Sequence, residues 1–253
     1  MSTAFLTDIR TDIRETLLSS GDGEHGPLPP VLISMTLVTG LVDAFSYLVL
    51  GHVFVANMTG NVVFLGFALA GAPGFSIGAS LAAMAAFGVG ALLGGRVGTW
   101  QRAHRGRLHS SAAAAQAVFL AVAVILAAAG NPGDAGFRYG LIAVLGISMG
   151  IQNAVARTLA VPDLTTTVLT MTITGIAADS ALAGGSGSKA GRRLLTIATM
   201  LVGAVVGAEL IRHAQPWCPL LIGLVVIIAG AAATYTLGKP NPAWVHAPAG
   251  RAR

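Results

Sequence analysis

The sequence contains few charged residues and a single cysteine, and both scarcities narrow the class of protein. Only 10% of the 253 residues are charged, whereas soluble domains carry about 25%. With 54% hydrophobic residues and a mean hydropathy of +0.75, the chain has too little charge to cover a water-facing surface. Cys218 alone excludes an intrachain disulfide and any multi-cysteine metal site. The composition therefore predicts an integral membrane protein.

Motifs of common enzymes are also missing from the sequence. We find no P-loop, Rossmann glycine pattern, Gly-x-Ser-x-Gly elbow or paired-carboxylate motif, and the six histidines lack metal-ligand spacing. We therefore predict no cofactor, no metal site and no catalytic residue. The net charge of +5 could suggest nucleic acid, but basic cytoplasmic loops of a membrane protein explain it more simply.

Eight apolar stretches fill most of the chain, and most approach the about 20 residues that a spanning helix needs. The second and sixth are the most polar. If these two enter and leave the membrane on one face, all 15 Lys and Arg residues except Arg138 and Arg212 fall on the side of the N-terminus. If all eight cross, this bias is weak, so the positive-inside rule favours six crossings with both termini cytoplasmic. The stretches are 31–51, 53–72, 77–95, 112–130, 139–157, 165–184, 194–211 and 218–237.

Three sequence blocks recur in order at an offset of roughly 110 residues, which indicates an internal duplication. "GLVDA" returns as "GIQNA", "NMTGNVVFLG" as "TTVLTMTITG", and "VGALLGGR" as "VGAVVGAE". The halves are 31–130 and 139–237. Each has three crossings and one re-entrant element, so the second half is inverted relative to the first.

The predicted fold is thus an all-α polytopic membrane protein with six transmembrane helices, two re-entrant or broken polar segments and an inverted repeat. Residues 31–237 form a single membrane domain, 1–30 a cytoplasmic segment and linker, and 238–253 a cytoplasmic tail. "FLTDIRTDIRETLL" has the spacing of an amphipathic surface helix, and a disordered tail is the alternative.

Polar residues inside the apolar stretches are the candidate functional site. Asn57 and Asn61 are four residues apart, so on a helix they share one face. The repeat pairs them with Thr166 and Thr170, and it pairs Asp43 with Asn153. An intramembrane acid is a functional candidate because charge is costly there. Alternatively, these groups only bond neighbouring helices. The predicted substrate or ion site comprises Asp43, Asn57, Thr59, Asn61, Gln152, Asn153, Thr166, Thr170 and Asp179.

Two further patterns concern packing and partners. The GxxxG pairs Gly90/Gly94 and Gly203/Gly207 predict close helix packing within the chain, with a homodimer interface as the alternative. The basic stretch 95–110 fits a cytoplasmic loop, and gripping of anionic lipid headgroups or nucleic acid is the alternative.

The chain resembles the YoaK family of bacterial inner-membrane proteins, which is classified as a domain of unknown function. The resemblance rests on "GLVDAFSYLVLGHVFVANMTGNVVFLG", "GIQNA" and "TTTVLTMTITGIAADS", and extends from about residue 31 to 237. Met171 departs from the family pattern, where glycine is usual. The resemblance implies six spans in the bacterial cytoplasmic membrane and supplies no substrate.

Three functions are compatible with this pattern. The first is a small secondary transporter or channel for a small polar solute or ion, with lipids as the other partners. The second is an intramembrane enzyme acting on a lipid or prenyl compound, for which Asp43 and His52 are the only nearby acid–base couple. The third is a membrane scaffold subunit that transports nothing. We prefer the first.

Overall fold

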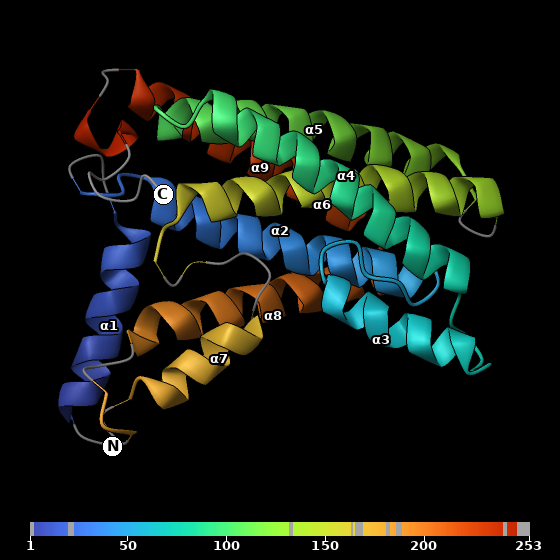
Figure 1. The fold of residues 1–253 in the computed structure, drawn as a ribbon, viewed down its shortest axis with the longest axis horizontal. Coiled ribbons are helices and arrows are strands. Elements are labelled where there is room, and N and C mark those ends of the chain that lie inside the picture. Colours follow the sequence, from blue (N-terminus) through green and yellow to red (C-terminus); the bar gives the residue numbers. More distant parts are fainter. Residues whose placement is uncertain are drawn as a thin grey trace.

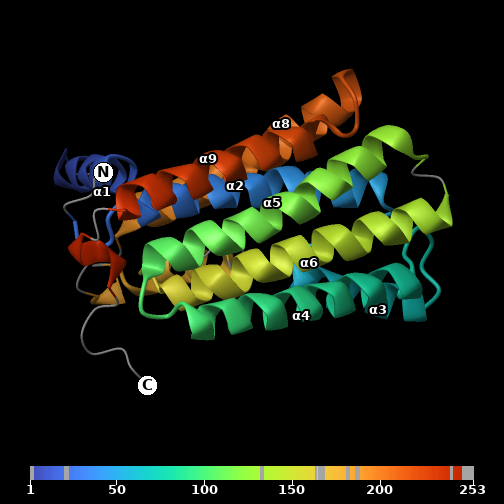
Figure 2. The same cartoon turned by 90° about the horizontal axis from the view of Figure 1, so that it is seen from above.

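Six long helices form the body of the protein in a computed structural model. The structure describes residues 3–19, 23–131, 134–162, 164, 169–180, 183–185, 189–239 and 242–246. All six are long and apolar enough to cross a membrane, and Figures 1 and 2 show them running in a common direction. They are α2 (Leu28–Val49), α4 (Ile77–Trp100), α5 (Arg105–Ala129), α6 (Ala135–Leu159), α8 (Ala190–His213) and α9 (Cys218–Gly238).

The predicted fold class is confirmed: the described residues form an all-α polytopic membrane protein. Some helices begin earlier than their apolar stretches, because polar caps extend them. His104 Nδ1 accepts a hydrogen bond from the Arg107 amide at 3.1 Å, which starts α5 seven residues before the predicted stretch at 112. Asp134 likewise accepts from the Gly136 amide at 2.8 Å at the start of α6. Such caps satisfy amides that have no partner within the helix.

The second and sixth apolar stretches form short helices rather than helices long enough to span a membrane. They are α3 (Met58–Leu69) and α7 (Leu169–Ala178). The 12 residues of α3 extend about 18 Å, too short for a hydrocarbon core of about 30 Å. In Figure 1, α2 ends and α4 begins at the same end of the bundle. Segment 50–76 therefore begins and ends at one end of the bundle, as the predicted re-entrant arrangement requires.

Helices α2 and α6 are the central helices of the bundle. Their most apolar windows are 72% and 61% buried, whereas the other four long helices are at most 28% buried. Burial of α2 and α6 positions the polar residues that they contain inside the protein, away from lipid. The exposed faces of α4, α5, α8 and α9 are rich in large apolar side chains such as Leu92, Ile125, Leu201 and Val225, as lipid contact requires.

Glycines allow each central helix to approach an outer one. In α2, a Cβ on Gly40 would collide with the backbone of α8, 2.8 Å from the Ala204 amide and closer still to the Met200 carbonyl. In α6, a Cβ on Gly150 would lie 2.7 Å from the Ala91 amide of α4. Backbones come this close only where the side chain is absent.

The GxxxG glycines belong to these same two crossings. Gly203 and Gly207 of α8 face α2, while Gly90 and Gly94 of α4 face α6. All four therefore pack against helices of their own chain.

An amphipathic helix, α1 (Thr3–Leu17), crosses the end of the bundle at which α8 begins (Figure 1). Asp12 accepts a hydrogen bond from the Gly191 amide at 3.2 Å, and Thr16 accepts one from Arg192 at 3.1 Å. Of the two interpretations of the N-terminal segment, the helix is thus the one observed, and it packs on α8.

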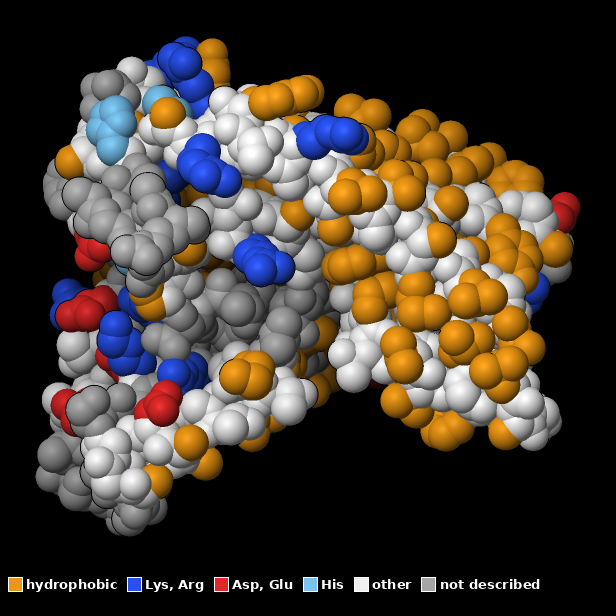
Figure 3. All heavy atoms as spheres, in the orientation of Figure 1, with side chains coloured by type: hydrophobic (Ala, Val, Ile, Leu, Met, Phe, Trp, Pro, Cys, Tyr) orange, Lys and Arg blue, Asp and Glu red, His pale blue; other side chains and the backbone are white. Residues whose placement is uncertain are grey.

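We call the end of the bundle that holds α1 the basic end, because most Lys and Arg residues gather there (Figure 3). The helix ends that meet there include Arg105, Arg157, Arg192 and Lys239. Arg138 and Arg212 lie at the opposite end, at the start of α6 and the end of α8. The short 3-10 helix η2 (Ala243–Val245) also lies at the basic end, with Trp244 and Val245 buried.

Candidate functional site

Asp43 holds the backbone of the re-entrant segment. It lies on α2 and is only 5% exposed. Its Oδ1 accepts hydrogen bonds from the amides of Val55 and Ala56, at 3.2 and 3.0 Å. These residues belong to the non-helical stretch that precedes α3. Oδ2 is buried and has no partner among the described residues, so half of this carboxyl group is available to another donor or to a cation.

Asn61 fixes the same stretch from the other side. Its Oδ1 accepts from the Phe54 amide at 2.9 Å, and its Nδ2 donates to the Phe54 carbonyl at 2.5 Å. The side chain is fully buried. Because Phe54 lies outside any helix, its backbone groups need such a partner in an apolar surrounding. Asn61 therefore supports the backbone of the stretch that precedes α3, and its bonds run to this stretch rather than to a neighbouring helix.

Asn57 and Thr59 are placed differently from Asn61. Asn57 is the N-cap residue of α3, with non-helical backbone angles and no side-chain cap bond. The prediction that Asn57 and Asn61 share one helical face is wrong, because the helix begins only at Met58. Thr59 is exposed on the first turn of α3.

Gln152 is the centre of a second polar cluster in the bundle. It is 1% exposed on α6. Its Nε2 donates to Thr39 Oγ1 of α2 at 2.9 Å and to the Met35 carbonyl at 3.3 Å. Its Oε1 accepts from Gln116 of α5 at 2.6 Å. One side chain thus joins three helices, while Gln116 Oε1 has no partner among the described residues.

His109 continues this cluster toward α9. It is 1% exposed, and its Nδ1 lies 2.9 Å from Thr234 Oγ1. Thr234 donates its own proton to the Gly230 carbonyl at 3.0 Å, so we assign His109 Nδ1–H as the donor. Its Nε2 faces the Met35 sulfur at 3.4 Å. Met35 therefore contacts both His109 and Gln152.

Residues of α2 connect the two clusters. Met35, Thr39 and Asp43 are spaced four apart, so they line one face of the helix. A row of buried polar groups thus extends from His109 through Gln152 to Asp43.

The remaining predicted residues lie away from this row or outside the described residues. Asp179, at the end of α7, is 53% exposed and pairs with Arg193 of α8 at 2.8 Å, so it is a partly exposed ion pair. Thr170 is exposed on α7. Asn153 Nδ2 donates to the Met149 carbonyl of its own helix at 2.9 Å. Thr166 lies outside the described residues.

Sequence reasoning missed Thr39, His109, Gln116 and Thr234. His109 was assigned to the basic loop 95–110, because α5 was expected to begin at 112. Gln116 is a lone amide within an alanine-rich run, and a polar side chain at mid-membrane was the available signal.

Known proteins identify the family. A family model described as "Protein of unknown function (DUF1275)" matches residues 31–233. The chain belongs to this family. It is also 34% identical over 155 residues to the UPF0700 transmembrane protein YoaK of Bacillus subtilis (strain 168), an alignment that covers 59% of this chain and 65% of that relative. No solved structure matches the chain.

The predicted resemblance to the YoaK family is confirmed by these matches. In this DUF1275 chain, the block Gly40–Gly66 contains Asp43 and Asn61 together with the stretch that they hold. The block Gly150–Ala154 contains Gly150, where α6 packs closely on α4, and Gln152 with its hydrogen bonds to α2. Two of the blocks that suggested the family thus build the re-entrant segment and the central packing of the bundle.

Proposed function

We propose that this protein is a small secondary transporter or channel for a small polar solute or ion, with Asp43 as its central polar group. The observation that supports this most is the geometry of Asp43. One carboxyl oxygen binds the non-helical stretch before α3, and the other is buried without a partner among the described residues. Broken helices and acids at membrane depth are how many secondary transporters bind solutes and coupling ions.

We further infer that the chain is an inverted repeat. The sequence alignment pairs Gly40 with Gly150, and Gly90 with Gly203. In the structure, Gly40 contacts the α8 glycine and Gly150 contacts the α4 glycine. The α2–α8 contact thus becomes the α6–α4 contact when α2 is exchanged with α6 and α4 with α8. This correspondence supports alternating access between halves as the mechanism.

The positive-inside rule makes the basic end cytoplasmic in this proposal. We propose the cytoplasmic membrane as the location, with α1 on its inner face. A homodimer would need another surface, because the four GxxxG glycines already contact helices of the same chain.

A scaffold without a solute is the second candidate. It is favoured by Asn61, whose two amide atoms are both bonded within the protein. The enzyme alternative has less support: His52 Nδ1 bonds the Gly74 carbonyl at 3.0 Å, and Asp43 bonds Val55 and Ala56. Neither set of bonds joins His52 to Asp43 as an acid–base pair.

The test is ion and solute flux in proteoliposomes. We would measure currents after steps in pH, Na⁺ and K⁺ on a solid-supported membrane, and glycerol entry by stopped-flow light scattering. Asp43→Asn keeps the shape but removes the charge, and it should abolish whichever flux the natural protein shows. Val62→Ala, on a 60% exposed residue of the same segment, should leave the flux unchanged. Equal flux for Asp43→Asn and the natural protein would exclude Asp43 as the central group.

A further inference from the structure

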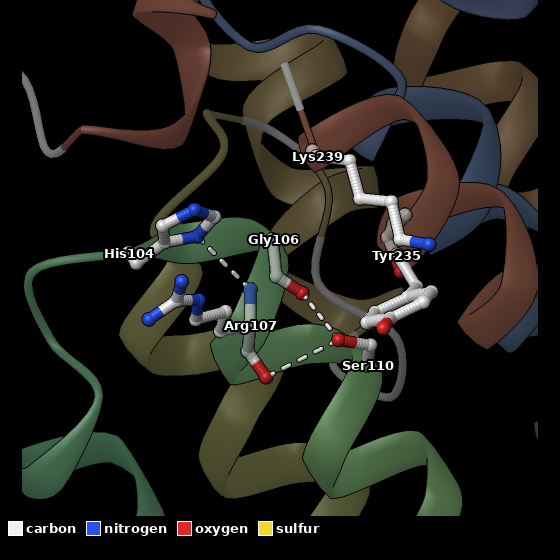
Figure 4. Close-up of a pocket in the computed structure, with 8 residues that line it drawn as sticks. His104, Gly106, Arg107, Ser110, Tyr235 and Lys239 are labelled. Carbon is white, nitrogen blue, oxygen red and sulfur yellow. Dashed lines mark hydrogen bonds between the residues drawn. The ribbon is translucent and has the colours of Figure 1, made fainter. Parts of the chain in front are cut away.

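A basic pocket lies at the basic end of the bundle, between the start of α5 and the end of α9 (Figure 4). Its volume is about 540 Å³. His104, Arg107 and Ser110 line one side, and Tyr235 and Lys239 line the other. Gly106 and Gly238, which also line it, leave space because they have no side chain.

The charge of this pocket is positive. None of its lining residues is acidic, and two of them, Arg107 and Lys239, are exposed cationic residues. Lys239 Nζ lies 4.7 Å from the centre of the Tyr235 ring. His104 accepts from the Arg107 amide, and burial together with the Arg107 charge lowers the His104 pKa below its ordinary value. Arg107 and Lys239 are thus the groups that would attract an anion.

An apolar furrow continues from the pocket along the outer face of α5 and α9. It shares Arg107, Ser110 and Tyr235 with the pocket. It has a volume of about 720 Å³, and the polar residues Gln101 and Ser111 also line it. Its remaining lining is small or apolar, namely Ala114, Ala117, Ile228, Ala231 and Ala232. The alanines leave the furrow open, because larger side chains at these positions would fill it.

The length of the furrow matches one leaflet of a bilayer. Arg107 and Ala117 are ten residues apart on α5, which is about 15 Å along the helix axis. Half of a hydrocarbon core of about 30 Å is also about 15 Å. The cationic pocket therefore lies at the depth of the headgroups, with Tyr235 in the interfacial zone that tyrosine favours. The furrow lies at the depth of the acyl chains.

We propose that this surface binds an anionic phospholipid of the leaflet at the basic end. The headgroup phosphate lies in the pocket, where Arg107 and Lys239 supply the positive charge, and one acyl chain lies in the furrow between α5 and α9. Charge complementarity selects the headgroup, and the continuous apolar furrow selects a lipid over a free phosphate. The site is separate from Asp43 and does not depend on the transport proposal.

The test measures lipid binding to the purified full-length protein in a non-ionic detergent, by native mass spectrometry. Phosphatidylglycerol is the probe, and phosphatidylcholine is the zwitterionic comparison. The double variant Arg107→Gln/Lys239→Gln should bind phosphatidylglycerol at least about tenfold more weakly than the natural protein, because two interfacial cations are lost. Arg102→Gln, an exposed arginine nearby that does not line the pocket, is the matched control and should bind as the natural protein does.

A second pair of variants distinguishes a lipid from a free anion. Ala232→Trp fills the furrow and should weaken phosphatidylglycerol binding. Val118, which is 64% exposed on α5, does not line the furrow, so Val118→Trp should not weaken binding. Glycerol 3-phosphate, which has no acyl chain, should compete only weakly.

Three results would overturn the proposal. The first is equal binding of phosphatidylglycerol and phosphatidylcholine. The second is equal phosphatidylglycerol binding by the double variant and Arg102→Gln. The third is tight binding of glycerol 3-phosphate together with no effect of Ala232→Trp, which would mean that the pocket binds a soluble anion. All substituted side chains are exposed, and melting temperatures in detergent would verify that each variant is folded.

Discussion

Asn61 shows at the scale of one residue why a polar side chain occurs in an apolar segment. Its amide group replaces the helical hydrogen bonds that Phe54 lacks. Asp43 does the same for Val55 and Ala56, but retains one unpaired oxygen. The sequence singled out both residues because polar groups are costly in hydrocarbon. Their partners could not be predicted, because the position at which the chain leaves helical geometry is not encoded in spacing alone.

Removing the Asn61 amide should destabilise the protein strongly. Asn61→Leu leaves the part-buried amide and carbonyl of Phe54 without the partners that Asn61 supplies, each costing about 1–3 kcal/mol. We expect a loss of roughly 2–4 kcal/mol, seen as a lower melting temperature in detergent. Thr59→Val, on an exposed neighbour, serves as the control. Equal melting temperatures for the two variants would contradict the structural role of Asn61.

His104 should make the stability of the protein decrease at acid pH. Its folded pKa is lowered by burial and by the Arg107 charge, so the unfolded chain binds the proton more readily than the folded one. Its contribution is complete above the ordinary pKa of 6.5 and is lost as the pH falls through the lower folded value. Protonation also removes the acceptor that caps the Arg107 amide.

The measurement for His104 is the melting temperature between pH 8 and pH 5. His104→Asn retains a capping side chain but does not titrate in this range, so its melting temperature should fall less between these pH values than that of the natural protein. Parallel pH profiles for the two proteins would show that His104 does not titrate in this way.

At the scale of helices, two glycine crossings define how the bundle is assembled. Gly40 brings α2 against α8, and Gly150 brings α6 against α4. The apolar stretches predicted which helices exist, because a spanning helix needs a continuous apolar run. They did not predict where α5 begins, since its first turns are polar and capped by His104. They also did not show that His109 and Gln116 would face inward.

A methyl group at Gly150 should separate α4 from α6. Its Cβ would lie 2.7 Å from the Ala91 amide, so the helices must move apart, and we expect Gly150→Ala to cost about 1–3 kcal/mol. At Gly88, on α4, a methyl group would meet no atom within 4 Å. Gly88→Ala should therefore be neutral or stabilise the helix by about 0.5–1 kcal/mol. Thermal unfolding in detergent compares the two, and equal losses would mean that the crossing tolerates a methyl group.

At the scale of the whole molecule, the distribution of charge and the path of the segment between α2 and α4 both agree with six membrane crossings. Most basic residues gather at the end that holds α1 (Figure 3), as the prediction of six crossings required. That prediction came from the apolar stretches together with the positions of arginine and lysine, and it is the part of the fold that the sequence encodes most directly. Residues 165–168, which precede α7 in the sequence, lie outside the described residues.

Cysteine labelling from the two sides of the membrane tests this topology. In a Cys218→Ser background, we would introduce His52→Cys, Pro73→Cys and Arg102→Cys, all at exposed positions. Because α3 returns to the face that it left, a membrane-impermeant maleimide should label positions 52 and 73 from the same side, and position 102 only from the other. With the basic end inside, intact cells would expose 52 and 73, and inverted vesicles would expose 102. If α3 crossed the membrane instead, 52 and 73 would react from opposite sides, and the stretch held by Asp43 would belong to a spanning helix rather than to a re-entrant one.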